Sequence, residues 1–140
     1  MARILGVDLG SVRVGLAVSD PAGLTAQPLD VLKVGDADDI VAAVALRASE
    51  LEVGEIVVGI PLRMDGAHGP EADAAESFAL RLEKATSVPV RRWDERLSTV
   101  EASRTMRSAG AGARRQRGVV DKVAAALVLG AYLESRRPRT

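Results

Sequence analysis

The 140-residue sequence contains no cysteine and only one histidine, His68. Disulfides, thiolate metal sites and a cysteine nucleophile are therefore excluded, and a single histidine cannot build a zinc site. Aromatic side chains are just as scarce, being limited to Phe78, Trp93 and Tyr132. The chain therefore lacks the stacking platform that reads single-stranded bases, so recognition of a nucleic acid would rely on shape and backbone.

Long apolar runs are also missing, because no segment approaches the length that spans a membrane. Met1 to Arg3 lead directly into a strand-like segment, without the regions of a signal peptide, and we expect a cytoplasmic protein. The composition, with 47% apolar and 27% charged residues, is typical of a globular chain. The length predicts one domain over residues 1–140.

The net charge is zero, but the charges are unevenly distributed. Residues 1–90 contain 7 Lys and Arg against 14 Asp and Glu, a net charge of −7, whereas residues 91–140 contain 12 against 5, a net charge of +7. The second part could bind a polyanion such as a nucleic acid. Solvated helix faces would explain the same asymmetry.

Periodicity and turn signals divide the chain into strands and helices. The first three segments predict an antiparallel meander of Ile4 to Leu9, Val12 to Val18 and Thr25 to Val34. Helices are then predicted at Asp38 to Leu51, Pro70 to Lys84, Ser98 to Gly110 and Val119 to Glu134, and strands at Ile56 to Ile60 and Val88 to Trp93. Residues 61–69 are a predicted loop and the basic residues 110–118 a predicted mobile stretch. This order predicts an α/β fold whose mixed five-stranded sheet, three antiparallel strands and then two with crossover helices, is flanked by helices.

Asp8 is the most informative residue, because it interrupts an apolar run at the end of a predicted central strand. A buried carboxylate is costly unless it is protonated, paired or bound to a metal. Hydrogen bonding to the turn at Gly10-Ser11 is an alternative explanation.

Glu95 and Asp121 occupy comparable places in the sequence. Glu95 follows the last predicted strand, and Asp121 opens the last predicted helix on its apolar face. Each has an ordinary explanation as well. The neighbours Asp94 and Arg96 offer Glu95 a surface ion pair, and the helix macrodipole favours an acid at the start of a helix.

Three acids from separate segments, all aimed at one edge of the sheet, are better explained together by a hard divalent cation than by three coincidences. Oxygen ligands without His or Cys indicate Mg²⁺ or Mn²⁺. Such sites typically hold two ions ~4 Å apart, which activate a water and stabilise the leaving oxygen of a phosphoryl displacement. The expected cofactor is therefore a pair of Mg²⁺ or Mn²⁺ ions, and the expected chemistry is that of a nuclease.

Several motifs along nearly the whole chain carry a resemblance to a known family. They are Gly6-Val7-Asp8-Leu9-Gly10-Ser11, Val18-Ser19-Asp20-Pro21, Thr25-Ala26-Gln27-Pro28, Ile56-Val57-Val58-Gly59-Ile60-Pro61-Leu62 with Met64-Asp65-Gly66, Trp93-Asp94-Glu95-Arg96-Leu97-Ser98-Thr99-Val100-Glu101-Ala102, and Gly118-Val119-Val120-Asp121-Lys122-Val123-Ala124-Ala125. Together they resemble the YqgF, or RuvX, proteins, a branch of the RuvC-like RNase H superfamily. The resemblance implies an RNase H-like fold and catalytic, metal-binding roles for Asp8, Glu95 and Asp121.

Basic residues near these acids are predicted to bind the substrate. The set consists of Arg13, Arg96, Arg114, Arg115, Arg117 and Lys122. Arg13 matches a basic position of the family and could contact a phosphate near Asp8, or could face solvent in the hairpin. The three arginines before the last predicted helix could grip phosphates beside the metals, or could belong to a solvated loop.

The resemblance implies two competing activities, because family members are similar to Holliday junction resolvases and are also assigned to maturation of the 5′ end of pre-16S rRNA. We place RNA processing ahead of junction cleavage. Asp8 to Ser11 also resemble the first phosphate loop of actin-like and sugar-kinase ATPases, which bind nucleotide between two such domains. A non-catalytic RNA or ribosome-assembly factor is a further alternative. The sequence leaves open whether the protein is a monomer or a homodimer.

Overall fold

The computed structural model describes residues 2–35, 37–97 and 113–136, with the exception of the side chains of 37, 38 and 113–122. The predicted helix Ser98 to Gly110 lies outside the described residues. For the rest of the chain the predicted order of strands and helices is confirmed. None of the helices in the described ranges is long and apolar enough to cross a membrane.

The chain opens with the predicted meander, formed by β1 (Ile4–Leu9), β2 (Arg13–Ser19) and β3 (Ala26–Lys33). β2 pairs antiparallel with both of its neighbours. The turn between β2 and β3 is closed by Asp20, whose Oδ1 accepts hydrogen bonds of 2.7 Å from the amides of Leu24 and Thr25. A short polar side chain of this kind is a common device for stabilising turns.

Two parallel strands extend the sheet on the other side of β1. α1 (Ala37–Glu50) leads into β4 (Glu55–Ile60), and α2 (Pro70–Ala85) leads into β5 (Val90–Asp94). β4 pairs parallel with β1 and with β5, so the order of strands is β3-β2-β1-β4-β5. β5 runs directly into the short 3-10 helix η1 (Glu95–Leu97). The predicted mixed five-stranded sheet is therefore confirmed.

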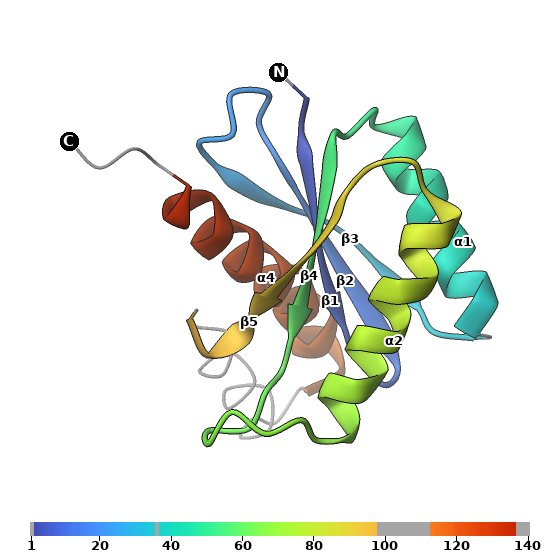
Figure 1. Cartoon of the computed structure of the whole chain (residues 1–140), viewed down its shortest axis with the longest axis vertical. Coiled ribbons are helices and arrows are strands. Elements are labelled where there is room, and N and C mark those ends of the chain that lie inside the picture. Colours follow the sequence, from blue (N-terminus) through green and yellow to red (C-terminus); the bar gives the residue numbers. More distant parts are fainter. Residues whose placement is uncertain (1, 36, 98–112, 137–140) are drawn as a thin grey trace.

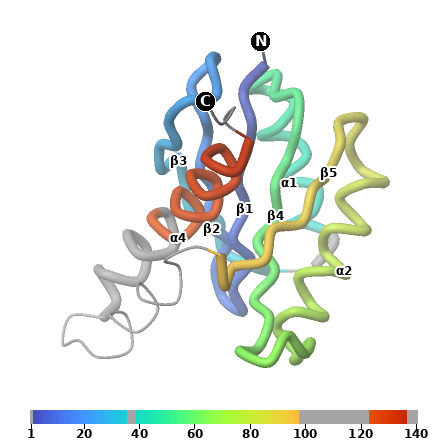
Figure 2. The backbone as a smooth tube through the Cα atoms, turned by 60° about the vertical axis from the view of Figure 1, so that its left-hand side comes forward, coloured from blue at the N-terminus to red at the C-terminus, as the bar shows by residue number. Residues whose placement is uncertain are grey.

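Helices cover both faces of the sheet (Figure 1). α1 and α2 lie together on one face, and α4 (Ala113–Ser135) lies on the other, which the turned view in Figure 2 also shows. Alternate residues of each strand point to opposite faces. Leu5 and Val7 of β1 belong to the core beneath α1 and α2, whereas Ile4 packs with Leu129 and Leu133 beneath α4. The central strands are therefore buried on both sides.

The start of α4 differs from the predicted start of the last helix at Val119. α4 begins at Ala113, so the prediction of a mobile stretch over 110–118 is wrong from residue 113 onward, and Asp121 lies inside the helix instead of opening it. Arg and Gln are good helix formers, and the single Gly118 costs only about 1 kcal/mol relative to Ala. Packing of the later turns against the sheet can outweigh such a cost.

α4 approaches the sheet closely because β1 contributes a glycine at the crossing. A Cβ on Gly6 would lie 2.8 Å from the Cβ of Leu129 and 3.2 Å from the carbonyl oxygen of Ala125. No side chain fits there without movement. This close contact fixes the distance between the helix and the strand that carries Asp8.

Candidate active site

Asp8 lies near the carboxyl end of β1 on the face covered by α4. It follows Gly6 by two residues, so both residues belong to the same face of the strand. It pairs with Gly15 of β2, and only 3% of its surface is exposed. Asp8, which interrupts an apolar run in the sequence, is therefore a carboxylate buried in the central strand.

Glu95 is the first residue of η1 and is also buried, with 4% of its surface exposed. Its Oε1 lies 2.6 Å from the place that a Cβ would occupy on Gly59, and Cγ2 of Val128 lies 3.1 Å from the same place. The carboxylate therefore rests on the backbone of β4, beneath α4. This burial contradicts the interpretation of Glu95 as a surface residue.

The two acids meet because β1 and β4 are adjacent and parallel. Val7 pairs with Val58, and one residue further along this register places Asp8 beside Gly59. Neighbouring strands lie ~4.8 Å apart, and Glu95 sits directly over Gly59. The structure therefore brings Asp8 and Glu95 to the same face and the same edge of the sheet, although 87 positions separate them in the sequence.

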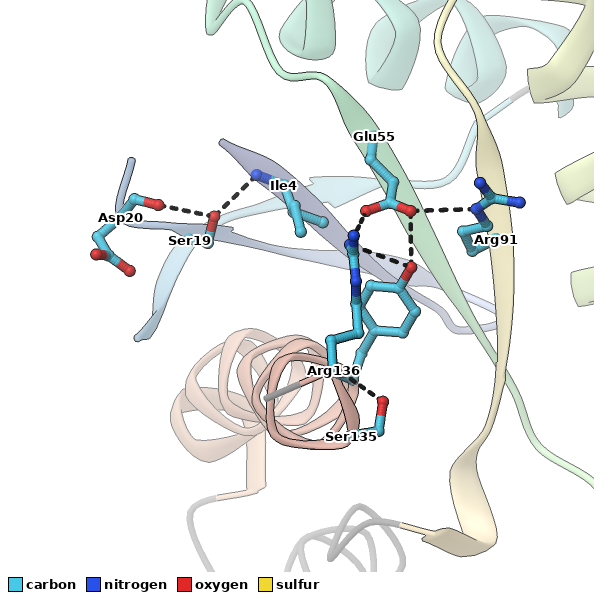
Figure 3. Close-up of polar contacts among 8 residues, drawn as sticks. Ile4, Ser19, Asp20, Glu55, Arg91, Ser135 and Arg136 are labelled. Carbon is cyan, nitrogen blue, oxygen red and sulfur yellow. Dashed lines mark hydrogen bonds and ion pairs between the residues drawn. The ribbon is translucent and has the colours of Figure 1, made fainter. Parts of the chain in front are cut away.

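A second polar cluster holds the other end of α4 to the sheet (Figure 3). Glu55, the first residue of β4, accepts hydrogen bonds from Oη of Tyr132 at 2.7 Å, Nε of Arg91 at 3.1 Å and Nη1 of Arg136 at 2.5 Å. Burial, and then the bond to Glu55, raise the pKa of Tyr132, so its hydroxyl stays protonated and donates. Sequence reasoning missed this cluster, although an acid at the start of the apolar strand β4 is a signal of the same kind as Asp8.

This cluster defines the direction of α4 and the place of Asp121. The last turns of α4 meet the start of β4, while Ala125 meets Gly6 in the middle of β1, so the helix runs antiparallel to both strands. Position 121 is one turn before Ala125, ~6 Å closer to the carboxyl ends of the strands. The backbone at position 121 thus lies at the same end of the sheet as Asp8 and Glu95. The side chains of Arg114, Arg115, Arg117, Asp121 and Lys122 lie outside the described residues.

Arg96, a predicted substrate-binding residue, is engaged within the protein. Its Nε and Nη2 donate to the Asp94 carboxylate at 3.1 and 2.7 Å, and its Nη1 donates to the carbonyl oxygen of Met64 at 3.3 Å. The hydrogen bond from Arg96 holds the pKa of Asp94 below its usual value. Arg96 thus ties the loop 61–69 to η1.

Arg13 is the other predicted substrate-binding residue whose side chain is described. It begins β2, two residues before Gly15, the partner of Asp8. Alternation along the strand places Arg13 on the face of Asp8, and its side chain is half-buried. Arg13 lies at the same end of the sheet as the two acids.

The chemistry of the two buried acids fits a hard divalent cation. Carboxylate oxygens are the donors that Mg²⁺ and Mn²⁺ prefer, and Asp8 and Glu95 bring two of them to one edge. Among the described side chains, no group of three or more His, Cys, Asp or Glu is placed to hold a metal ion. The third predicted donor, Asp121, is at this edge by its backbone position alone.

A cleft with a volume of about 490 Å³ lies at the opposite end of the sheet. It is lined by residues that include Ile4, Leu24, Leu133 and Arg136. Since these residues belong to the amino end of β1 and the last turns of α4, the cleft is separate from the edge of the two acids.

The fold is the RNase H-like α/β fold of the RuvC-like nucleases. The structure described as T. thermophilus RuvC in complex with Holliday junction substrate matches with a TM-score of 0.62 at 19% identity, covering 97% of this chain and 96% of that chain. The chain itself belongs to the RuvX family, whose model, described as "RuvX: Holliday junction resolvase", matches residues 2–135.

Curated relatives agree with this assignment. A protein of Anaeromyxobacter dehalogenans (strain 2CP-C) is 51% identical over 97% of this chain and 99% of its own length. A protein of Myxococcus xanthus (strain DK1622) is 46% identical over 97% of this chain and 90% of its own length. Both carry the name "Putative pre-16S rRNA nuclease".

Proposed function

We propose that this protein is a metal-dependent nuclease whose site consists of Asp8, Glu95 and Asp121. The observation that carries the proposal is the convergence of two buried carboxylates at neighbouring strands, Asp8 on β1 and Glu95 over Gly59 of β4. Carboxylate oxygens are the donors that Mg²⁺ and Mn²⁺ prefer. Two carboxylates on one face and at one end of the sheet therefore suit a divalent cation.

In phosphodiester hydrolysis, the side chains of this protein would hold the metal ions and bind the substrate. When bound, a pair of Mg²⁺ or Mn²⁺ ions supplies an activated water and a stabilised leaving oxygen. Asp8 is held by the central strand and Glu95 by the end of β5, so both carboxylates are pre-positioned on rigid elements. Arg13, at the same edge, is placed to bind a phosphate of the substrate.

The substrate that we favour is the 5′ end of pre-16S rRNA. The names of relatives that match over nearly their full length support it. The net charge of +7 over residues 91–140 supports a nucleic acid in general. A four-way DNA junction is the second candidate, because the family description and the RuvC complex both name it.

The decisive experiment compares wild type with Asp8→Asn. Each protein is incubated with pre-rRNA, single-stranded RNA, single-stranded DNA and a four-way junction, with Mg²⁺, Mn²⁺ or EDTA. We expect cleavage by wild type that EDTA abolishes, and loss of at least ~10³-fold in Asp8→Asn, which removes the charge that a cation needs. Mass in solution is measured alongside, because symmetric junction cleavage requires two active sites.

Asp73→Asn is the matched control, since this carboxylate has 72% of its side chain exposed and lies on α2, on the opposite face. It should cleave like wild type. Full activity of folded Asp8→Asn, or cleavage that persists in EDTA, would contradict the metal-dependent site. Tight binding of RNA by wild type with no cleavage in either metal would favour a non-catalytic RNA-binding factor.

A further inference from the structure

Trp93, the only tryptophan of the chain, lies beside the candidate site. It belongs to β5 and pairs with Gly59 of β4. Its side chain packs with the core beneath α4, which is the face that carries Asp8 and Glu95. Trp93 therefore shares a face with the acids although it has no charge.

Glu95 and Trp93 are both neighbours of Gly59, Glu95 through its carboxylate and Trp93 through its pairing with Gly59 in the sheet. Oε1 of Glu95 lies 2.6 Å from the Cβ position of Gly59, and side chains of paired residues on one face start ~5 Å apart. An indole extends further than this distance from its own Cβ. The carboxylate is thus within reach of an indole that starts at the position paired with Gly59.

The indole N–H of Trp93 is a buried donor whose acceptor is missing. Nε1 has no hydrogen-bond partner among the described residues. Leaving a buried donor unsatisfied costs about 1–3 kcal/mol, and such groups are uncommon in folded proteins. A buried donor of this kind is suited to hold a carboxylate oxygen that comes within hydrogen-bond distance of it.

The ring of Trp93 is itself braced by the cluster at the end of α4. Its ring centroid lies 6.0 Å from that of Tyr132 in an edge-on contact with an interplanar angle of 86°. Tyr132 is held in turn by its hydrogen bond to Glu55 and by Arg136 over its ring. The indole is therefore braced by a side chain of α4.

We propose that Trp93 is a positioning residue for the Glu95 carboxylate, acting through its braced indole ring and its unpaired indole N–H. The consequence for cleavage rests on the proposed nuclease function, whereas the positioning of Glu95 by Trp93 can be tested without metal or substrate. It extends the site from three acids to a residue that touches neither a cation nor a phosphate.

NMR of metal-free protein tests the contact directly, because one tryptophan gives one indole N–H signal. In protein with ¹⁵N-labelled tryptophan, Glu95→Gln should shift this signal clearly, whereas Glu83→Gln should not. Glu83 is a suitable control because it pairs with Arg92 on the α2 face. An unchanged indole signal in folded Glu95→Gln would overturn the proposal.

Trp93→Phe tests the positioning role, since phenylalanine keeps a ring and removes the N–H. We expect the two γ protons of Glu95 to give distinct signals in wild type and nearly equivalent ones in the variant, together with a fall in kcat of about tenfold at little changed KM. γ protons that stay distinct in Trp93→Phe would overturn the proposal. Absence of cleavage by wild type would instead contradict the proposed function and leave the NMR results to decide the role of Trp93.

Discussion

The Glu95 carboxylate occupies the space that a side chain on Gly59 would need. Its Oε1 lies 2.6 Å from the ideal Cβ position of Gly59, and its Cγ lies 3.1 Å away. Separations below 3.0 Å require one of the groups to move. Because Gly59 has no side chain, the Glu95 carboxylate can lie against β4. The backbone of β4 thus determines where the first side chain of η1 can lie.

Gly59→Ala should consequently displace the Glu95 carboxylate. A misplacement of about 1 Å can reduce an enzymatic rate about 100-fold, and we expect a loss of this order in metal-dependent cleavage. Gly35→Ala is the control, because its Cβ would meet no atom within 4 Å. Equal cleavage rates for the two folded variants would show that Glu95 does not need this space.

Gly6→Ala should weaken the packing of α4 on the sheet. The added methyl would lie 2.8 Å from Cβ of Leu129, and overpacking of this kind typically costs about 1–3 kcal/mol. Gly130→Ala, within α4, would meet only Cβ of Ala26 at 3.9 Å, and should be neutral or stabilising by about 0.5–1 kcal/mol because alanine favours helix. Urea unfolding of both variants measures the difference; a reversed order would contradict the close approach.

The Asp94–Arg96 pair should stabilise the protein except in acid. The hydrogen bond from Arg96 lowers the pKa of Asp94 from its ordinary value of 3.8. A lowered folded-state pKa contributes stability above the unfolded value, and this contribution is lost as pH falls through the folded value. The stability difference between wild type and Asp94→Asn should therefore be present at pH 7 and shrink well below pH 3.8. Denaturant unfolding across this range measures it, and a difference that grows in acid would contradict the prediction.

Divalent cations should stabilise the folded protein through Asp8 and Glu95. A ligand that binds only the folded state at 100 times its Kd adds about 2.7 kcal/mol, so saturating Mn²⁺ should raise Tm by several degrees. Asp8→Asn should lose this response, because it removes one of the carboxylates proposed to bind the cation. The same Mn²⁺ response in wild type and Asp8→Asn would place the cation elsewhere.

Local patterning was sufficient for most of the fold, because the apolar run of β1, the alternation in β2 and the helical spacing in α1 and α2 agree with the tertiary packing. The start of α4 is the exception. Gly110, Gly112 and Gly118 mark a loop by local rules, but the helix extends through Gly118 because its later turns bury apolar residues against the sheet.

The sequence by itself determined that Asp8 is out of place in an apolar strand and that no sulfur or histidine cluster can bind a metal. It left Glu95 with an ordinary explanation, since the neighbouring Asp94 and Arg96 suggest a surface ion pair. Only the tertiary structure decided that these neighbours pair with each other while Glu95 is buried over Gly59. The reason is physical. The parallel pairing of β1 with β4 and of β4 with β5 joins segments that are far apart in the sequence, and this pairing determines which strand ends lie side by side.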